Sequence, residues 1–178
     1  MYIILAERGG FEPPMSCPIP LFESGQFNHS CISPFRLIIP EVYTSTMEDS
    51  IYTKIIKGEV PSHKIYEDDR VIAFLTIQPF APGHTLVVPK RQVDQLWDLT
   101  EDEYAYLMQV VKKLAVHMRQ VTGKDRIGMA VKGFEVPHIH VHLVPMSRGE
   151  EVSLDVNDVS FADQEELAAI AEKLRFND

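Results

Sequence analysis

The apolar positions after residue 47 follow short periods that change type along the chain. Ile51, Tyr52 and Ile55 share one side of a helix that Gly58 would end, so Ser50–Gly58 is predicted to be a short helix. Apolar runs bounded by turn residues predict strands. The predicted strands are His63–Glu67, Val71–Ile77, His84–Pro89, Arg126–Lys132 and His138–Val144, and a last helix is predicted at Gln164–Leu174.

One long helix is predicted from Glu101 to about Thr122. Thr100 is a suitable N-cap, Glu103 completes a capping box, and Gly123 ends the pattern. Its apolar stripe comprises Tyr104, Leu107, Met108, Val111, Leu114, Ala115, Met118 and Val121. The order of helix, three strands, helix and two strands lacks the alternation of a doubly wound parallel sheet. We therefore expect an α+β fold, with a five-stranded, mostly antiparallel sheet and one long helix packed across it.

Residues 1–46 differ from the rest of the chain. They hold six of the twelve prolines but only six charged residues, and they show no sustained period. We expect either a disordered extension or a stretch translated from upstream of a true start at Met47, because the coding of Phe11-Glu12-Pro13 resembles a transfer-RNA arm. The expected organisation is this extension at 1–46, a main domain at 47–146, and an acidic loop with a helix at 147–178.

Composition narrows the class of protein. The net charge is −9 and apolar residues make up 45%, which is typical of an acidic globular chain. A nucleic-acid polymer or an anionic membrane would need a cationic face, so neither is expected as a partner. No apolar run is long enough for a membrane span or a secretory signal, so we expect a cytoplasmic protein. Both cysteines, Cys17 and Cys31, precede Met47, which excludes a cysteine zinc site in the main body.

Three histidines alternate with apolar residues in the last predicted strand. On a strand, His138, His140 and His142 would share one face, about 6.5–7 Å apart, and the residues between them would be buried against the long helix. Three imidazoles in a row are costly as plain structure, because they cannot all be charged together. We therefore interpret the row as functional.

Two chemistries can use such a row. A His-x-His pair on a strand can bind a metal ion, with Glu135 as the only further ligand close by in sequence. Alternatively, a neutral imidazole can attack phosphorus while its neighbours donate hydrogen bonds to the phosphoryl oxygens, and no metal is required. The residues alone leave both chemistries open. No P-loop motif and no GxGxxG motif after a strand is present.

Three stretches resemble the histidine-triad (HIT) superfamily of nucleotide hydrolases and transferases, and most closely the small bacterial members of its Hint-like, nucleotide-binding branch. Asp49–Pro61 looks like the opening helix of that family, and Ala81–Lys90 looks like its strand with a fourth histidine. Gly133–Pro145 contains the HxHxHxx signature with apolar x positions. The resemblance covers about residues 48–146.

The resemblance implies an enzyme that acts at the α-phosphorus of nucleoside phosphoramidates, (di)nucleoside polyphosphates or related conjugates of a purine nucleoside monophosphate. His140 would be the nucleophile that forms a transient nucleotidyl-histidine, and His142 would contact the phosphate and help to protonate the leaving group. His138 and His84 would orient the nucleophile and line the phosphate pocket. No cofactor is implied. A homodimer is expected, in which two five-stranded sheets join.

The resemblance also implies a nucleoside pocket and a change in its polar contacts. The pocket residues would be Ile51, Tyr52, Ile55, Thr76, Ile77 and Leu86. Ile77 and Leu86 could equally be plain core residues. Thr76 stands where family members commonly use an Asp to bind the ribose, and it offers only a neutral hydrogen bond. Glu135 stands where a Ser often contacts phosphate, and a carboxylate there repels phosphate unless it is turned away or protonated.

Two further expectations follow from such departures. Some bacterial relatives hold a structural zinc at the positions of Ser50, Thr53, Gln92 and His138, and three of those four ligands are absent here, so no metal is expected. Thr76 and Glu135 also favour an alternative to the enzyme, a dimeric nucleotide-binding or sensor protein with low turnover.

Overall fold

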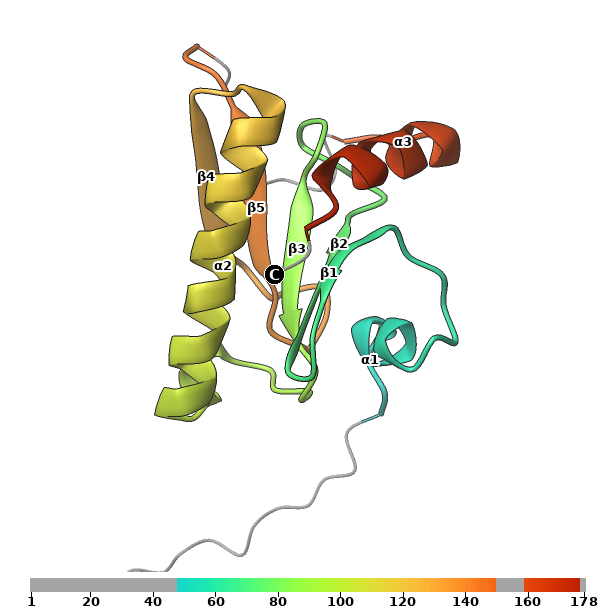
Figure 1. The fold of residues 1–178 in the computed structure, drawn as a ribbon. Helices are drawn as coiled ribbons and strands as arrows, with labels where there is room; N and C mark the ends of the chain where they lie inside the picture. The colour runs from blue at the N-terminus through green and yellow to red at the C-terminus, as the bar shows by residue number, and fades with distance from the viewer. Residues whose placement is uncertain (1–47, 150–158, 177–178) are drawn as a thin grey trace, which may run out of the picture. The chain divides into compact units, whose positions relative to one another are not determined.

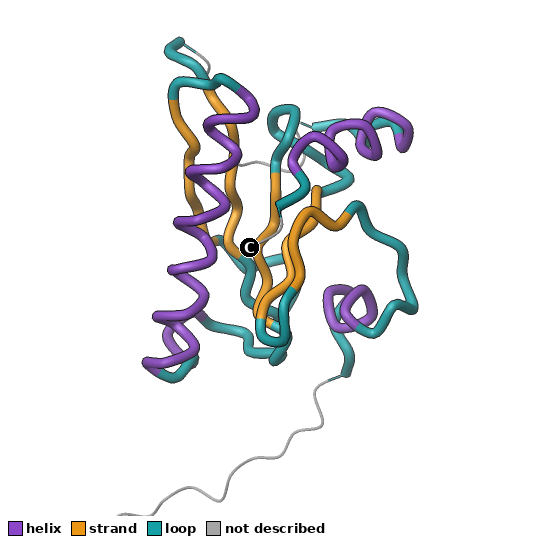
Figure 2. Tube along the Cα trace, in the orientation of Figure 1, coloured by secondary structure: helices purple, strands orange, loops and turns teal. Residues whose placement is uncertain are grey.

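Five strands form one antiparallel sheet in the order β1-β2-β3-β5-β4 (Figures 1 and 2). The computed structural model describes residues 48–149 and 159–176. The strands are β1 Lys64–Glu67, β2 Val71–Leu75, β3 Thr85–Pro89, β4 Arg126–Val131 and β5 Val141–Met146, and a short 3-10 helix, η1, spans Leu96–Asp98. The predicted α+β class is confirmed. The predicted extension at 1–46 and the acidic loop at 150–158 lie outside the described residues.

Helix α2, Glu101–Thr122, lies along one face of the sheet (Figure 1). Thr100 and Glu103 form the predicted capping box. Gly123 ends the helix with φ at 66°, a left-handed conformation that suits glycine. The side chains that α2 buries are Leu107, Val110, Val111, Leu114 and Met118.

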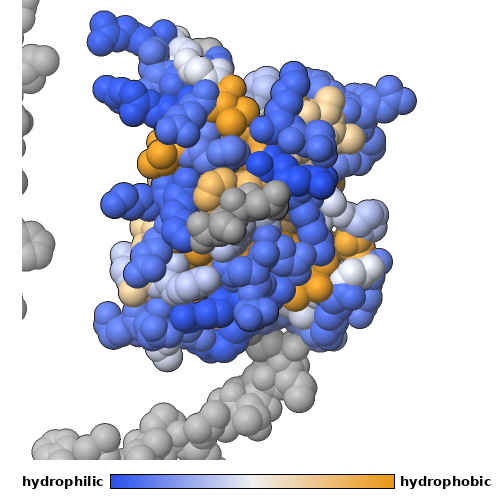
Figure 3. Space-filling view, viewed as in Figure 1, coloured by the Kyte–Doolittle hydropathy of each residue, from blue (hydrophilic) through white to orange (hydrophobic). Residues whose placement is uncertain are grey.

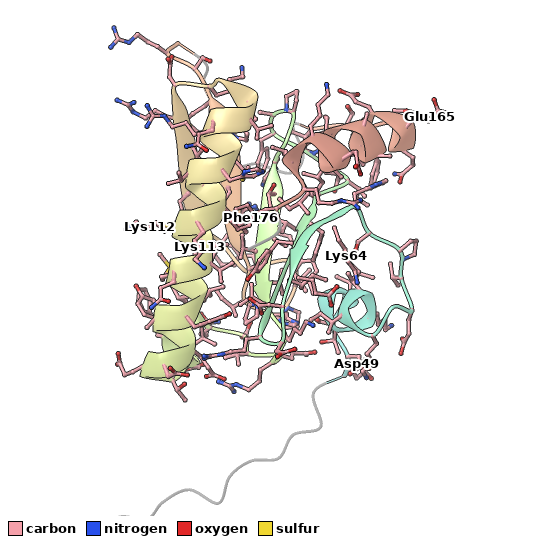
Figure 4. The ribbon with its side chains drawn as sticks, viewed as in Figure 1. Asp49, Lys64, Lys112, Lys113, Glu165 and Phe176 are labelled. Atoms are coloured by element: carbon pink, nitrogen blue, oxygen red, sulfur yellow. The ribbon has the colours of Figure 1, made fainter. Side chains whose placement is uncertain are left out.

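Helix α3, Gln164–Leu174, packs into the same hydrophobic core as α2. Its Leu167, Ala171 and Leu174 are buried there. The chain after the helix contains Phe176 (Figure 4) and is tied to β1. The Phe176 N–H donates to the carbonyl of Ile65 at 2.8 Å. The C-terminal helix, predicted at the same residues, is therefore part of the domain's core.

The central strands β2 and β3 are buried on both faces because successive residues of a strand point to opposite sides. One set of their side chains joins the core beneath α2 and α3: Val71, Ala73, Leu75 and Val87. The other set packs with Ile55 of helix α1, Ile51–Ile56: Ile72, Phe74, Leu86 and Val88. The sheet therefore separates a large core from a smaller one, and the smaller core borders the candidate site.

The sequence predicts that the three histidines of the row lie on one strand, and this prediction is wrong. Strand β5 begins at Val141, so only His142 of the three is part of it. The Ile139 N–H donates to the carbonyl of Val93 at 2.6 Å, so this backbone donor is not available for pairing in the sheet. The apolar residues of the row are nevertheless buried in the large core as expected: Ile139, Val141 and Leu143.

The surface is mainly hydrophilic on the face shown in Figure 3. In the part of the chain that the structure describes, no helix combines the length and the apolar character needed to cross a membrane. Edge strand β4 is an exception to the polar surface, because Met129 and Val131 are 56% and 39% exposed. Apolar side chains on an uncovered edge strand are typical of a surface that pairs with another strand.

Candidate active site

A cavity of about 500 Å³ borders helix α1 and the smaller core. Side chains of α1, of β2 with the loop after it, and of the loop before β5 form its wall. Every residue predicted to bind the nucleoside lies in this wall: Ile51, Tyr52, Ile55, Thr76, Ile77 and Leu86. A concave, mostly apolar site with a few convergent polar groups is where small molecules bind.

Three of the four predicted catalytic histidines meet in this cavity. His84, His140 and His142 are all in its wall. The ring centroids of His140 and His142 are 4.8 Å apart, and those of His84 and His142 are 5.2 Å apart. Leu86 of β3 pairs with His142 of β5, which places His84, two residues earlier, on the same side of the sheet. Strand pairing therefore brings together histidines that are 58 residues apart.

Hydrogen bonds decide which nitrogens of His84 and His142 carry protons. The Phe80 N–H donates to His84 Nδ1 at 3.2 Å, so the proton of this neutral ring is on Nε2. His84 Nε2–H then donates to His142 Nδ1, 3.0 Å away. The proton of His142 is consequently on Nε2, a buried atom without a hydrogen-bond partner among the described residues. Such an unpaired N–H in a cavity wall is a donor available to a ligand oxygen.

His140 differs from His142, because its Nε2 atom is an acceptor with a lone pair and not an N–H donor. Its Nδ1 lies 2.9 Å from the carbonyl oxygen of His138, which can only accept, so Nδ1 carries the proton and Nε2 keeps its lone pair. The sequence predicts His138 in the phosphate pocket, but the structure places it, fully buried, behind the cavity wall. Its Nε2 lies 2.8 Å from the carbonyl oxygen of Pro89. His138 is thus in a position to orient His140 and not to touch a ligand.

Burial lowers the pKa of all four histidines. It is the main reason that the pKa of His84 falls to about 3 and that of His142 to about 4, and the neighbouring imidazoles lower both pKa values further. Burial also lowers the pKa of His138 and of His140, although their hydrogen bonds to backbone carbonyls act in the opposite direction. The four rings are therefore neutral at pH 7. A neutral imidazole has the lone pair that nucleophilic attack requires.

Among the residues that the structure describes, Glu135 is the only one that contributes a carboxylate to the cavity wall. Lys132 Nζ lies 3.2 Å from its Oε1. Burial opposes ionisation, but the hydrogen bond from Lys132 helps to lower the pKa of Glu135 below its usual value. The side chain is therefore ionised at pH 7, and its charge raises the pKa of His140 against the effect of burial.

The positions that hold zinc in some relatives are joined by hydrogen bonds. Ser50 Oγ lies 2.8 Å from His138 Nδ1, and Gln92 Oε1 accepts from the Ser50 N–H and the Thr53 hydroxyl. Both nitrogens of His138 are thereby occupied, and hydroxyl and amide groups are poor substitutes for thiolates and imidazoles as zinc ligands. These residues do not fit a zinc ion. Within residues 48–149 and 159–176, no group of three or more His, Cys, Asp or Glu is placed to hold a metal.

Sequence reasoning missed several residues of the cavity wall. His63, predicted only as the first residue of a strand, lines the cavity, and its Nε2 lies 3.0 Å from Oε1 of Gln164 on α3. The Phe80 ring stacks on His84 at 4.9 Å between centroids. Ser62 Oγ is buried in the same wall, without a hydrogen-bond partner among the described residues. Phe80 could have been found from the sequence, because it lies four residues before His84 in a proline-bounded loop. The contact between His63 and Gln164 spans 101 residues and leaves no local signal in the sequence.

An antiparallel five-stranded sheet that brings alternating histidines to a cavity of this size is the arrangement of a histidine-triad protein. Comparison with protein families agrees, because the model of the HIT domain matches residues 57–149. The chain belongs to the HIT domain family. Proteins of this family bind nucleotides and are in general nucleotide hydrolases.

Individual relatives cover most of the described domain. An uncharacterized HIT-like protein of Methanocaldococcus jannaschii is 36% identical over 122 residues, which are 66% of this chain and 94% of the relative. The adenosine 5'-monophosphoramidase of Saccharomyces cerevisiae is 38% identical over 113 residues, 60% of this chain and 67% of the relative. The crystal structure of a Hit-like protein of Bartonella henselae covers 71% of this chain and 94% of its own, with 33% identity and a TM-score of 0.66.

Proposed function

We propose that the protein hydrolyses or transfers at the α-phosphorus of purine nucleoside monophosphate conjugates through a nucleotidyl-histidine on His140. The observation that carries the proposal is the pairing of two different groups in one cavity. His140 offers an unprotonated Nε2, and His142 offers a buried, unpartnered Nε2–H, on rings 4.8 Å apart. One group can attack phosphorus while the other stabilises the charge that develops on a phosphoryl oxygen.

The reaction divides into two in-line steps. In the first, the electron pair of His140 Nε2 forms a bond to phosphorus, and the bond from phosphorus to the leaving group breaks. The leaving group departs with that electron pair and takes up a proton from solvent, next to the Nε2–H of His142. In the second, water attacks phosphorus and the bond to His140 Nε2 breaks, with its electron pair returning to the nitrogen. The attacking water gives one proton to solvent, which restores the proton that the leaving group took. The products are a nucleoside monophosphate and the protonated leaving group.

The apolar part of the cavity supports the nucleoside as the bound half of the substrate. Ile51, Tyr52 and Ile55 of α1 line it together with Ile77 and Leu86, and an apolar wall of this kind suits a flat base. We assign Thr76 of the cavity wall to the ribose, and its Oγ1 also accepts from the Gln78 N–H at 3.3 Å. The yeast relatives are adenosine 5'-monophosphoramidases, which supports the AMP amide as the first substrate to test.

A nucleotide-binding or sensor protein with low turnover is the second candidate. It is favoured by the ionised Glu135 in the cavity wall, because a carboxylate near a phosphate site raises the free energy of binding an anionic transition state. The hydroxyl of Thr76 is also a weaker partner for a ribose than a carboxylate would be.

Incubation with AMP amide and a panel of dinucleoside polyphosphates separates the two candidates. The enzyme releases AMP, and rapid acid quench of the wild type yields a nucleotidylated peptide that contains His140. His140→Asn is expected to lower kcat on the order of a thousandfold. His117→Asn is the matched control, since His117 lies outside the cavity, 3.2 Å from the Leu174 carbonyl. Binding of AMP without turnover in the wild type would instead establish the sensor.

We also infer a homodimer joined through β4. Strand β4 is an edge of the sheet, and its side chains Met129 and Val131 are apolar and exposed. Pairing of two β4 edges would cover both side chains and join two five-stranded sheets into one of ten strands. The other edge, β1, is contacted by α3 and by the chain that follows it.

A further inference from the structure

A one-way chain of hydrogen bonds runs from the N-terminus of α1 to the buried ring of His138. Gln92 Nε2 donates to the carbonyl of Glu48 at 3.0 Å, so Gln92 Oε1 faces the other way and accepts from the Thr53 hydroxyl and the Ser50 N–H. The Thr53 proton is therefore not available to Ser50. The single hydroxyl proton of Ser50 has two acceptors within reach, Thr53 Oγ1 at 3.2 Å and His138 Nδ1 at 2.8 Å, and the shorter contact assigns it to His138 Nδ1.

The Nε2 atom of His138 gives independent support for the direction in which these hydrogen bonds are donated. Its Nε2 lies 2.8 Å from the carbonyl oxygen of Pro89, which can only accept a proton. A neutral His138 with its proton on Nε2 has a lone pair on Nδ1, and that lone pair requires a donor. Ser50 supplies it. His138 is 0% exposed and Ser50 7% exposed, so the two groups meet where bulk water does not replace either of them.

The orientation of His138 is passed on to the nucleophile through the backbone. The carbonyl of His138 accepts from His140 Nδ1–H at 2.9 Å, and this bond keeps the lone pair of His140 on Nε2. The segment between the two histidines is outside the sheet, so strand pairing does not fix the carbonyl direction. Two contacts anchor this segment. The ring of His138 is hydrogen-bonded at both nitrogens, and the Ile139 N–H donates to the Val93 carbonyl.

We propose that Ser50 is a positioning residue that holds His138 as its Nε2–H tautomer and thereby keeps the lone pair of His140 on Nε2, facing the cavity. At the positions that hold zinc in some relatives, and where a zinc ion does not fit here, the hydroxyl of Ser50 thus holds the ring of His138 in place of a metal. The proposal rests on the proposed function of His140. A histidine in the wrong tautomer is inactive even where its position is preserved, as is known for catalytic triads.

Four variants separate proton donation from the other duty of Ser50, which caps α1 by accepting from the Thr53 N–H at 3.1 Å. Ser50→Ala removes both cap and donor. Ser50→Asp keeps a good cap acceptor but has no proton to donate at neutral pH, and Ser50→Thr keeps both. Thr100→Ala is the control, because it removes an equivalent cap at the start of α2, away from the cavity.

Two readouts are measured on the full chain. The first is steady-state hydrolysis of AMP amide, for which Ser50→Ala and Ser50→Asp are expected to lower kcat about tenfold with KM changed less than about twofold, as loss of an orienting bond to a functional histidine typically does. Ser50→Thr and Thr100→Ala are expected to keep the wild-type kcat. The second is the ¹⁵N spectrum of labelled histidines, in which a ring nitrogen with a proton is distinguished from one with a lone pair.

The spectrum of the wild type is expected to show His138 protonated on Nε2 and His140 protonated on Nδ1. In Ser50→Asp, His138 is expected to gain a proton on Nδ1. Wild-type kcat in both Ser50→Ala and Ser50→Asp overturns the proposal, and so does a loss of kcat with the two histidine patterns unchanged. If the wild type turns over no nucleotide, the proposed function fails, and the spectra of Ser50→Asp alone then decide whether Ser50 sets the tautomers.

Discussion

Tyr52 presents an edge-to-face contact to His140, with ring centroids 5.0 Å apart and planes at 68°. The same ring lies 5.8 Å from Phe74 and 5.9 Å from His138. Burial, and then the charge of Glu135, raise the pKa of Tyr52 to about 12, so the phenol stays neutral. A side chain predicted only to contact the base is therefore also packed against the proposed nucleophile.

The phenol ring of Tyr52, and not its hydroxyl, is expected to support His140. Tyr52→Phe keeps the aromatic contact, and its kcat/KM for AMP amide should stay within about twofold of the wild type. Tyr52→Ala removes the contact and one wall of the nucleoside pocket, and kcat/KM should fall about tenfold. Equal losses in the two variants would show that the hydroxyl is the important group.

The activity should persist in mildly acidic solution. Since kcat/KM reports the pKa of the free enzyme, and burial lowers the pKa of His140 from 6.5, the acid limb of the profile should lie below pH 6.5. The charge of Glu135 raises the pKa of His140, so Glu135→Gln should move that limb to still lower pH. It should also lower KM for anionic substrates by about twofold or more, because the repulsion is removed. A shift of the limb to higher pH would contradict this account.

The buried histidines should make the fold sensitive to acid. In the unfolded chain a histidine binds a proton below about pH 6.5, whereas folded His84 and His142, with pKa values of about 3 and about 4, do not. The unfolded state therefore binds more protons, and the free energy of unfolding should fall as the pH drops from about 6.5 towards 4. Urea midpoints over this window test the sign. His84→Asn should give a shallower decline, and a midpoint that rises on acidification would refute the prediction.

Strand β4 should hold the dimer together. Met129→Lys places a charge on the proposed interface, and the sedimentation coefficient should change from that of a dimer to that of a monomer. Phe161→Lys is the matched control, since Phe161 is 70% exposed and lies before α3, and it should remain dimeric. A monomeric wild type, or a dimer that survives Met129→Lys, would place the interface elsewhere or remove it.

Local patterns were sufficient for most of the fold. The capping box at Thr100 and the glycine at 123 defined α2 to the residue, because those signals act within one turn. The stripe of α2 was less accurate: Val110 is buried, whereas Tyr104 and Val121, near the two ends of the helix, are 37% and 42% exposed. Which side chains a helix buries depends on where the sheet lies beneath it, and that is a tertiary property.

The candidate site was predictable as a set of residues but not as a geometry. The HxHxHxx pattern indicated the chemistry, yet the position of His138 depends on contacts with Ser50 and Pro89, 88 and 49 residues away. Alternation alone suggested a strand there, whereas the Ile139 N–H bonds to the Val93 carbonyl, outside the sheet. The tautomers, which decide what each ring can do, follow from those long-range partners and have no signature in the local sequence.

The two-sided burial of β2 and β3 has a practical consequence for engineering. The layer beneath α2 and α3 holds most of the apolar packing, while the reacting rings lie on the opposite face of the sheet that β2 and β3 belong to. Libraries of substitutions confined to the long helix can thus be selected for heat tolerance alone, and turnover screens can be directed at α1 and the loops around it.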